Sequence, residues 1–475
     1  MLYYNFKYEW LLLIRNRWIQ LLTILLLLLF GFAVYNGIQK VDARKQNITT
    51  AISEFKAKET ETLKVLDSIA KGFKVNKSRW LIPSRPIVIG NLLPRVVNMP
   101  AKPTAFIATG QSDLFAHYVK PTVAGDDLSM NYTEMTSPIQ LLFGSFDLAF
   151  VIIYLLPLLI IAFSFNVLAS ERESGTLKLL ASQPILIRTW VLQKLALRFF
   201  WLLVCISITL VVVFIIFSFN LMENWTAFAT LLAYIIVYTL FWFVLAFATN
   251  IWIHSSAKNA IALIGFWVFF VLLSPSILNQ MSNSVYPMPS RTLMLNQMRT
   301  LKAEATKKQD EILDNYLRDH PEYAINDSTQ TRNFYHRYMA TQNLVKEELR
   351  PVVEKFETQI DNQQQWAHTF SWLSPALTIQ NALNNLAGTS EKDYQAFRYQ
   401  SLEFAQEWRD FFIPYLFKNE KFKKSDYKNL PSFEYKYMQN TSNLRILGLL
   451  ALSFVIVLLV FVLKRIKQQI HSTTS

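Results

Sequence analysis

Residues 18–38 read WIQLLTILLLLLFGFAVYNGI, an apolar run long enough to cross a lipid bilayer as one helix. A bilayer core about 30 Å thick needs about 20 residues of α-helix. Among the qualifying stretches the only acidic residue is Asp147, near the start of the second. The sequence therefore predicts a mainly α-helical membrane protein with six transmembrane helices. These spans are Trp18–Ile38, Leu142–Val167, Trp190–Phe219, Phe228–Trp252, Ala260–Leu278 and Ile446–Leu463.

The composition agrees with a membrane protein. Of the 475 residues, 52% are hydrophobic and 17% charged, whereas soluble domains carry about 25% charged residues. The single cysteine, Cys205, excludes an internal disulfide and a cysteine metal cluster. The net charge of +13 is better explained by orientation signals beside the spans than by nucleic-acid binding.

Lysine and arginine in short flanks predict that both termini are cytoplasmic. The loop over residues 220–227 carries Glu223 and no basic residue, as expected outside. No cleavable signal peptide is expected, because the first apolar run is too long. The basic flanking residues are Lys7, Arg15, Arg17, Arg172, Lys178, Arg188, Lys258 and, in the tail over residues 464–475, Lys464, Arg465 and Lys467.

This topology divides the rest of the chain. Met1–Arg17 is amphipathic and is expected to lie along the inner leaflet as an interfacial helix; the alternative is an extension of span one. Two long insertions, Gln39–Leu141 and Asn279–Arg445, are expected outside the cytoplasm, and the loop over residues 168–189 inside it.

The first insertion is predicted to be small and α/β. A charged helical pattern runs from Val41 to Lys71, and Pro86–Ile89 and Thr104–Thr109 suggest strands. The second insertion is predicted to be mostly helical. Ser374-Pro375 and Gly388 mark the start and stop of one helix. The expected helices are Leu293–Arg318, Thr331–Trp366, Leu373–Leu386 and Gln395–Phe417.

The chemistry of an enzyme is missing. There is no Gly-x-x-x-x-Gly-Lys-Ser/Thr loop for ATP, no His-Glu-x-x-His and no Gly-x-Ser-x-Gly. Asp319-His320-Pro321-Glu322 is better explained as a helix terminator than as a metal site. His336 and His368 are isolated and are expected to be surface or packing residues. We therefore expect no catalytic residue, no metal and no cofactor on this chain.

The loop between spans two and three is more informative. Residues 169–185 read ASERESGTLKLLASQPI, with charges first, then leucines, then Pro184. The pattern predicts a short amphipathic helix over residues 171–185. It would either occupy a groove on a partner or lie passively at the membrane surface.

This stretch closely resembles the coupling loop of ABC-2 type permeases, whose pattern is Glu-x-Glu-x-Gly-Thr-Leu-x-x-Leu ending in Pro. The resemblance implies that a partner ATPase binds here, with Arg172 among the polar contacts and the leucines as buried anchors. The matching residues are Glu171, Glu173, Gly175, Thr176, Leu177, Leu180 and Pro184.

Further motifs are similar to a subgroup of these permeases, the domain-of-unknown-function 3526 (DUF3526) family. The resemblance implies a bacterial inner-membrane permease, paired with ABC ATPase subunits that hold ATP and Mg²⁺, and with a second permease copy or paralogue. A periplasmic partner is an option for the external insertions. The motifs are Gly110-Gln111-Ser112-Asp113-Leu114, Pro289-Ser290-Arg291, Asp319-His320-Pro321-Glu322 and Leu373-Ser374-Pro375-Ala376-Leu377.

Two functions stay open at this point. The near absence of charge in the spans favours export of an amphipathic or lipid-like substrate over a secondary transporter. The alternative is a non-transporting mechanotransmission or envelope-assembly protein that acts through its external domains. A third class, an intramembrane enzyme, would need polar catalytic groups that the spans lack.

Overall fold

A computed structural model of the chain describes residues 2–473, apart from 77, 79–80, 111, 113–115, 126–145, 178–181, 183–185, 218, 289, 324–333 and 438–443. Side chains are not described at 2–6, 8, 12, 291, 293–294, 444–445 and 463–473.

The described chain is almost entirely helical. Its α-helices are α1 (Leu2–Arg15), α2 (Arg17–Ala70), α3 (Pro86–Leu92), α5 (Leu148–Phe150), α6 (Leu156–Ser164), α7 (Ala169–Glu173), α9 (Ile187–Ile216), α10 (Trp225–Trp252), α11 (Ser256–Trp267), α12 (Ser274–Val285), α13 (Arg291–Lys307), α14 (Gln309–Asp319), α15 (Phe334–Phe370), α16 (Pro375–Ala387), α17 (Glu391–Phe417) and α18 (Leu444–Thr473). The remaining elements are strands β1 (Val97–Asn98) and β2 (Tyr118–Val119), π-helical turns η3 (Val151–Leu155) and η4 (Val268–Leu273), and 3-10 turns η5 (Pro321–Tyr323), η6 (Ser371–Leu373) and η7 (Asp426–Asn429).

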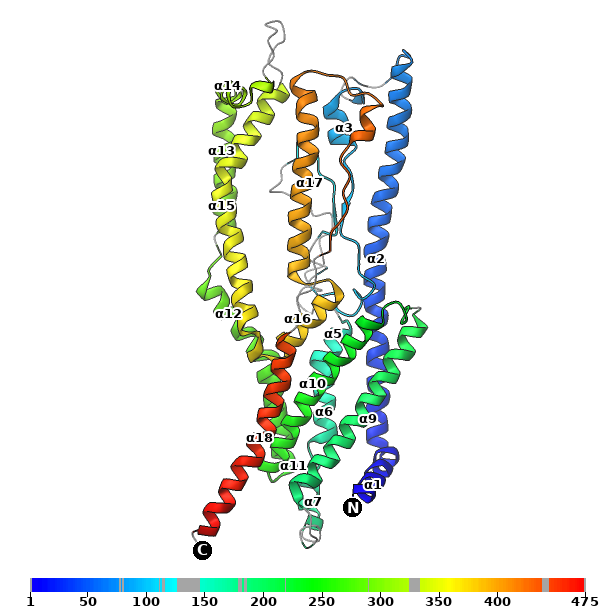
Figure 1. Ribbon diagram of the computed structural model, residues 1–475, viewed down its shortest axis with the longest axis vertical. Helices are drawn as coiled ribbons and strands as arrows, with labels where there is room; N and C mark the ends of the chain where they lie inside the picture. Colours follow the sequence, from blue (N-terminus) through cyan, green and yellow to red (C-terminus); the bar gives the residue numbers. More distant parts are fainter. Residues whose placement is uncertain are drawn as a thin grey trace.

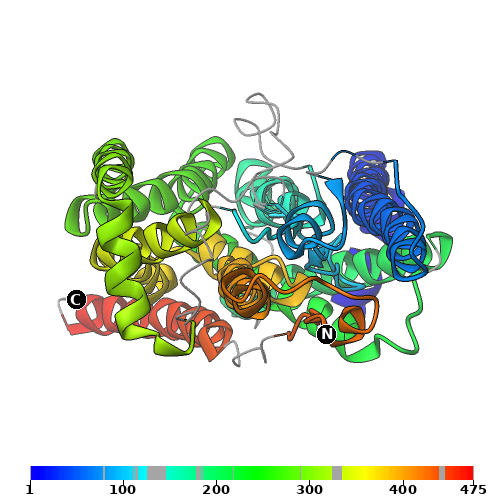
Figure 2. The same ribbon diagram turned by 90° about the horizontal axis from the view of Figure 1, so that it is seen from above.

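The helices form a bundle that continues into a long helical domain (Figure 1). Both termini and α7 lie at one end of the bundle, which we call the loop end. The opposite end, which we call the domain end, continues into the upper part of α2 and helices α3, α13–α15 and α17, with α16 at the junction. Seen from above, α17 lies between α15 and α2 (Figure 2).

Five helices of the described chain are long and apolar enough to cross a membrane. They overlap the first five predicted spans and confirm them as apolar helices. The sixth predicted span appears as a shorter apolar stretch, Ile446–Val462, within α18, so the count of six stays a prediction. The five helices are Arg17–Ala70, Leu148–Glu173, Ile187–Ile216, Trp225–Trp252 and Ser256–Val285.

The N-terminal segment is a separate helix and not an extension of span one. Asn16 is non-helical and separates α1 from α2. Its side chain caps α2 by accepting a hydrogen bond from Trp18 N at 3.0 Å. Beyond the predicted span, α2 continues to Ala70 as one helix of 54 residues. At 1.5 Å per residue its length is about 80 Å. This confirms the predicted helical pattern from Val41 onward.

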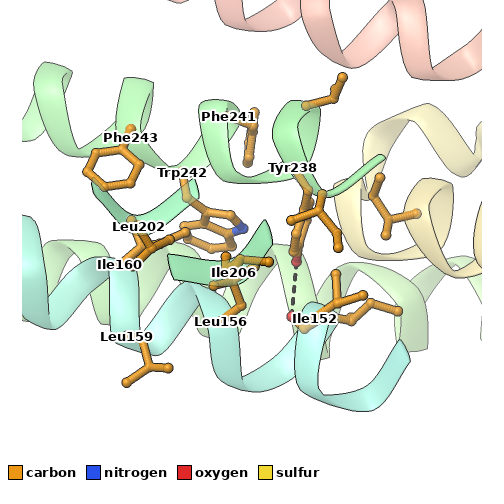
Figure 3. Packing of buried hydrophobic residues seen from close by; sticks show 14 of the residues in the cluster. Ile152, Leu156, Leu159, Ile160, Leu202, Ile206, Tyr238, Phe241, Trp242 and Phe243 are labelled. Atoms are coloured by element: carbon orange, nitrogen blue, oxygen red, sulfur yellow. Dashed lines mark hydrogen bonds between the residues drawn. The ribbon is translucent and has the colours of Figure 1, made fainter. Parts of the chain in front are cut away.

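Span two is irregular where a proline removes a backbone donor. Pro157 lacks the N–H that would satisfy the carbonyl of Ile153 four residues earlier. That carbonyl instead accepts a hydrogen bond from Tyr238 Oη at 3.0 Å (Figure 3). The next carbonyl, of Tyr154, accepts one from Trp267 Nε1 at 3.1 Å. Side chains of α10 and α11 therefore complete the hydrogen bonding of span two.

A side chain also bonds to an irregular turn of span five. The π-helical turn η4 precedes Pro275, and within it the carbonyl of Phe270 accepts a hydrogen bond from Ser374 Oγ at 3.0 Å. Ser374 also caps α16, which ends at Gly388 in a left-handed conformation (φ 69°). The predicted start and stop of this helix are thus confirmed.

The first long segment differs from its prediction at both expected strands. Residues 86–89 belong to helix α3, because Pro86 favours the first turn of a helix. Residues 104–107 lie in turns, and residues 104–109 are all buried. Within the described residues the sheet consists of β1 and β2, paired antiparallel with Val97 opposite Val119.

The second long segment is helical, as predicted, with one correction. The helix expected over Leu293–Arg318 is two helices, α13 and α14, which meet at Lys308. Near their tip, Phe417 of α17 stacks on His336 with ring centroids 4.8 Å apart and on Tyr323 at 5.2 Å. His336 Nε2 also contacts the carbonyl of Leu416 at 2.8 Å, so His336 is a packing residue.

The buried turns over residues 104–109 join the bundle to the domain. The carboxylate of Asp147 accepts hydrogen bonds from Thr109 N at 2.8 Å and from Phe150 N at 2.9 Å. Asp147 therefore caps span two and anchors the turns above it. Gly37 of α2 allows the same turns to approach closely, because a Cβ there would lie 2.3 Å from the carbonyl oxygen of Phe106.

This close approach makes a prediction for Gly37→Ala. The added methyl group must displace backbone atoms of the buried turns, and we expect a loss of about 1–3 kcal/mol in the free energy of unfolding. Thermal unfolding in mild detergent measures it. Gly31→Ala is the matched control on the same helix, because no atom lies within 4 Å of its Cβ position. Equal unfolding midpoints for the two variants would contradict the prediction.

Candidate coupling site

The candidate site begins where span two loses its regular helix. After α6, residues 165–168 form turns before α7 starts at Ala169. Asn250 of α10, fully buried, spans the break. Its Nδ2 donates to the carbonyl of Ser164 at 2.9 Å, and its Oδ1 accepts from Leu168 N at 3.2 Å.

A second buried asparagine also bonds to the break in span two. Asn259 of α11 donates a hydrogen bond from its side-chain amide to the carbonyl of Phe165. Backbone groups released by the break are thus satisfied by side chains of α10 and α11. A polar group left unpaired in this apolar surrounding would cost several kcal/mol. The break is therefore fixed in place, and α7 is held against two neighbouring helices.

Arg172 and Glu173 attach α7 to the short connection between α10 and α11. Arg172 Nη1 donates to the carbonyl of Ile253 at 3.0 Å. The carboxylate of Glu173 accepts from Ser256 N at 2.8 Å and from Ser256 Oγ at 2.9 Å. Since Ser256 is the first residue of α11, Glu173 places a negative charge at the positive end of that helix.

Glu171 faces in another direction, toward α9. One carboxylate oxygen pairs with Lys194 Nζ at 3.2 Å, and the other accepts a hydrogen bond from Thr176 Oγ1. Lys194 Nζ also lies 4.2 Å from the ring centroid of Trp190, a favourable cation–π distance. Three consecutive polar residues of α7 therefore contact three different elements: α9, the α10–α11 connection and the start of α11.

The predicted coupling helix is interrupted. Gly175 adopts a left-handed conformation (φ 78°) directly after the C-cap Ser174, a backbone state that favours glycine. Thr176 and Leu177 are helical again. The bend leaves Ser174, Gly175 and Thr176 exposed at the loop end, whereas Leu177 is half-buried against the bundle.

The structure thus brings together most of the residues expected from sequence. Glu171, Arg172, Glu173, Gly175, Thr176 and Leu177 lie within one loop, whereas Leu180 and Pro184 fall outside the described residues. Asn250, Asn259 and Ser256 were not predicted. The available signal was an uncharged polar residue at the end of an otherwise apolar run, which is common and carries little information by itself.

The described polar residues of the loop contact neighbouring elements through hydrogen bonds and an ion pair. Over the described part of the chain, no group of three or more histidine, cysteine or acidic residues is placed to hold a metal ion. At the predicted terminator, α14 ends at Asp319, and His320 Nδ1 contacts Glu322 Oε1 at 3.1 Å. The His320 side chain is 41% exposed and the Glu322 side chain 56%.

The described chain has five helices long and apolar enough to cross a membrane, with a braced loop after the second of them. Residues 115–274 match the family described as ABC-2 family transporter protein, and residues 291–436 match domain of unknown function DUF3526. The chain is therefore an ABC-2 family transporter protein of the subgroup that carries DUF3526. No curated protein matches the chain.

The bracing makes a prediction for Asn250→Ala. The change leaves the carbonyl of Ser164 and the N–H of Leu168 without their partner, at a cost of about 1–3 kcal/mol each. We expect a lower unfolding midpoint in detergent and faster proteolysis between residues 165 and 177. Asn220→Ala is the control, because Asn220 is exposed and its side-chain oxygen accepts a long hydrogen bond (3.4 Å) from Glu223 N. Unchanged proteolysis of Asn250→Ala would contradict the proposed bracing.

Proposed function

We propose that this chain is the permease subunit of an ABC-type exporter that couples ATP hydrolysis by a separate ATPase subunit to transport. A second permease copy or paralogue would complete the membrane part. The observation that carries the proposal is the exposed tip Ser174–Thr176, whose preceding residues are bound to α9, to the α10–α11 connection and to α11. A force on this tip reaches several spans at once, because the loop has little freedom to fold away.

In this proposal the loop end faces the cytoplasm of a bacterium, and the domain end projects beyond the inner membrane. The basic residues Lys7, Arg15 and Lys258 support this orientation, since all three belong to elements near the loop end (Figure 1). Both termini would then be cytoplasmic, as the sequence predicts.

We further propose an amphipathic or lipid-like cargo. The cations Lys194 and Arg198 of span three are engaged in ion pairs, and Asp147 is occupied as a helix cap. Transport of a small ion would call for charged groups facing a polar pathway. Span five instead presents exposed apolar side chains such as Ile261 and Phe269, which suits contact with lipid.

One observation favours the alternative, a mechanotransmission or envelope-assembly role. The part of α2 beyond residue 38 continues without a break for roughly 50 Å at 1.5 Å per residue, so tilting of span one would displace the far end of the domain. Both functions use the same coupling loop. Stimulation of ATP hydrolysis by a lipid in liposomes would support export over mechanotransmission.

Ser174→Trp tests the coupling role directly. Ser174 is exposed, and its hydroxyl makes only local contacts, to Glu171 and Thr176. The bulky ring should block a partner's groove without disturbing the bundle. We expect the affinity-tagged native chain, solubilised in mild detergent, to co-purify an ATPase subunit, and the variant to retain at least tenfold less.

Ser425→Trp is the matched control, an exposed serine in the domain. Leu177→Asp is a less selective variant, because Leu177 is half-buried against the bundle. An ATPase retained equally by Ser174→Trp and the control would show that the tip is not the docking point. A native chain without any ATPase would contradict the proposed function as a whole.

A further inference from the structure

Helix α1 carries a buried acid where an interfacial helix would ordinarily keep its charges in water. Glu9 is 1% exposed. Its carboxylate pairs with Arg198 Nε at 2.8 Å and lies 3.6 Å from Lys194 Nζ. Both cations belong to α9 and stand four residues apart, so they lie on the same face of that helix.

The burial of Glu9 is sustained by further contacts of α1 with the bundle. Trp10 meets Trp201 of α9 edge-to-face with ring centroids 5.2 Å apart. Leu13, one turn after Glu9, is fully buried in the bundle core. Arg198 also donates a hydrogen bond to the carbonyl of Phe163, at the end of α6. Helix α1 is therefore fastened to α9 and, through Arg198, to the last turn of span two.

Lys194 stands between α1 and the coupling loop. Its ammonium group is 3.2 Å from Glu171 of α7 and 3.6 Å from Glu9 of α1. The charged groups described in this cluster are two carboxylates and two cations, so their formal charges sum to zero. Little water reaches them, because Lys194 and Arg198 are about 85% buried, so screening is weak. A displacement of Glu171 must therefore change how Lys194 is shared between the two carboxylates.

We propose that Glu9, Lys194 and Glu171 form an ion-pair relay through which the coupling loop sets the position of α1. This inference rests on the proposed function, since it needs an ATPase that moves the loop. Glu9 and Lys194 are positioning residues: they transmit the displacement of Glu171 without touching ATP. Helix α1 is then a second moving output of the ATPase, in addition to spans two and three.

The test uses the full complex of the chain with its co-purified ATPase, in liposomes. Cys205→Ser removes the native thiol, and spin labels are placed at Lys7→Cys on α1 and Ile236→Cys on α10, two exposed positions. Pulsed electron spin resonance compares the label distance without nucleotide and with ATP plus vanadate. This readout needs no knowledge of the cargo.

We expect the label distance to change with nucleotide in the native relay, and the change to be at least threefold smaller in Glu9→Gln and in Lys194→Met. Lys194→Arg should keep the native change in label distance, because the positive charge is kept. Lys194→Met leaves the bond between Glu9 and Arg198 in place, so it keeps α1 docked should Glu9→Gln fold poorly. Glu223→Gln, at an exposed residue in the α9–α10 connection, is the control and should behave as native.

The outcomes separate the two proposals. An ATPase that co-purifies, together with an undiminished nucleotide-dependent change in Lys194→Met, overturns the relay and leaves the permease assignment standing. A label distance in the native relay that does not respond to nucleotide also overturns it. Failure of any ATPase to co-purify with the native chain overturns the proposed function itself.

Discussion

In hydrocarbon, a backbone carbonyl or N–H that loses its helical partner finds no water to replace it, so every irregular turn of a span must be completed by another part of the protein. Span two has two such places, before Pro157 and over residues 165–168. Tyr238 and Trp267 complete the first, and Asn250 and Asn259 complete the second. Much of the architecture of the bundle follows from this requirement, because α10 and α11 cannot separate from span two without exposing those groups.

The same requirement explains why hydropathy predicted the spans but not their contacts. Length and apolar character are properties of one segment, so the first five spans could be located from the sequence. The role of Asn250 depends on a break in a different helix 82 residues away in the chain. The burial of Glu9 likewise depends on Arg198, 189 residues later. Pairings of this kind are set by tertiary packing and leave no periodic signal.

The two segments wrongly predicted as strands, residues 86–89 and 104–109, each have a physical explanation. Pro86 begins a helix although the residues after it are β-branched, because proline favours the first helical turn and the segment is buried against α17. Residues 105–108 are apolar because their segment is enclosed by α2, span two and α16, and not because it forms a strand. In contrast, Ser374 and Gly388 marked a helix correctly, since capping is local: Ser374 acts through its side chain on the first turn, and Gly388 through its own left-handed backbone.

Helix α16 shows that the boundary of the DUF3526 match does not coincide with a boundary between packed cores. It lies within the matched DUF3526 region, yet its apolar face, including Ile379 and Leu383, belongs to the core of the membrane bundle. Thr104 and Thr389 add hydrogen bonds that cross between the two long segments, to the carbonyls of Leu386 and Ala108. The region that sequence comparison delimits is therefore not an independent folding unit. Transferring this region alone into another permease would place α16 against spans with which its apolar face had not been packed.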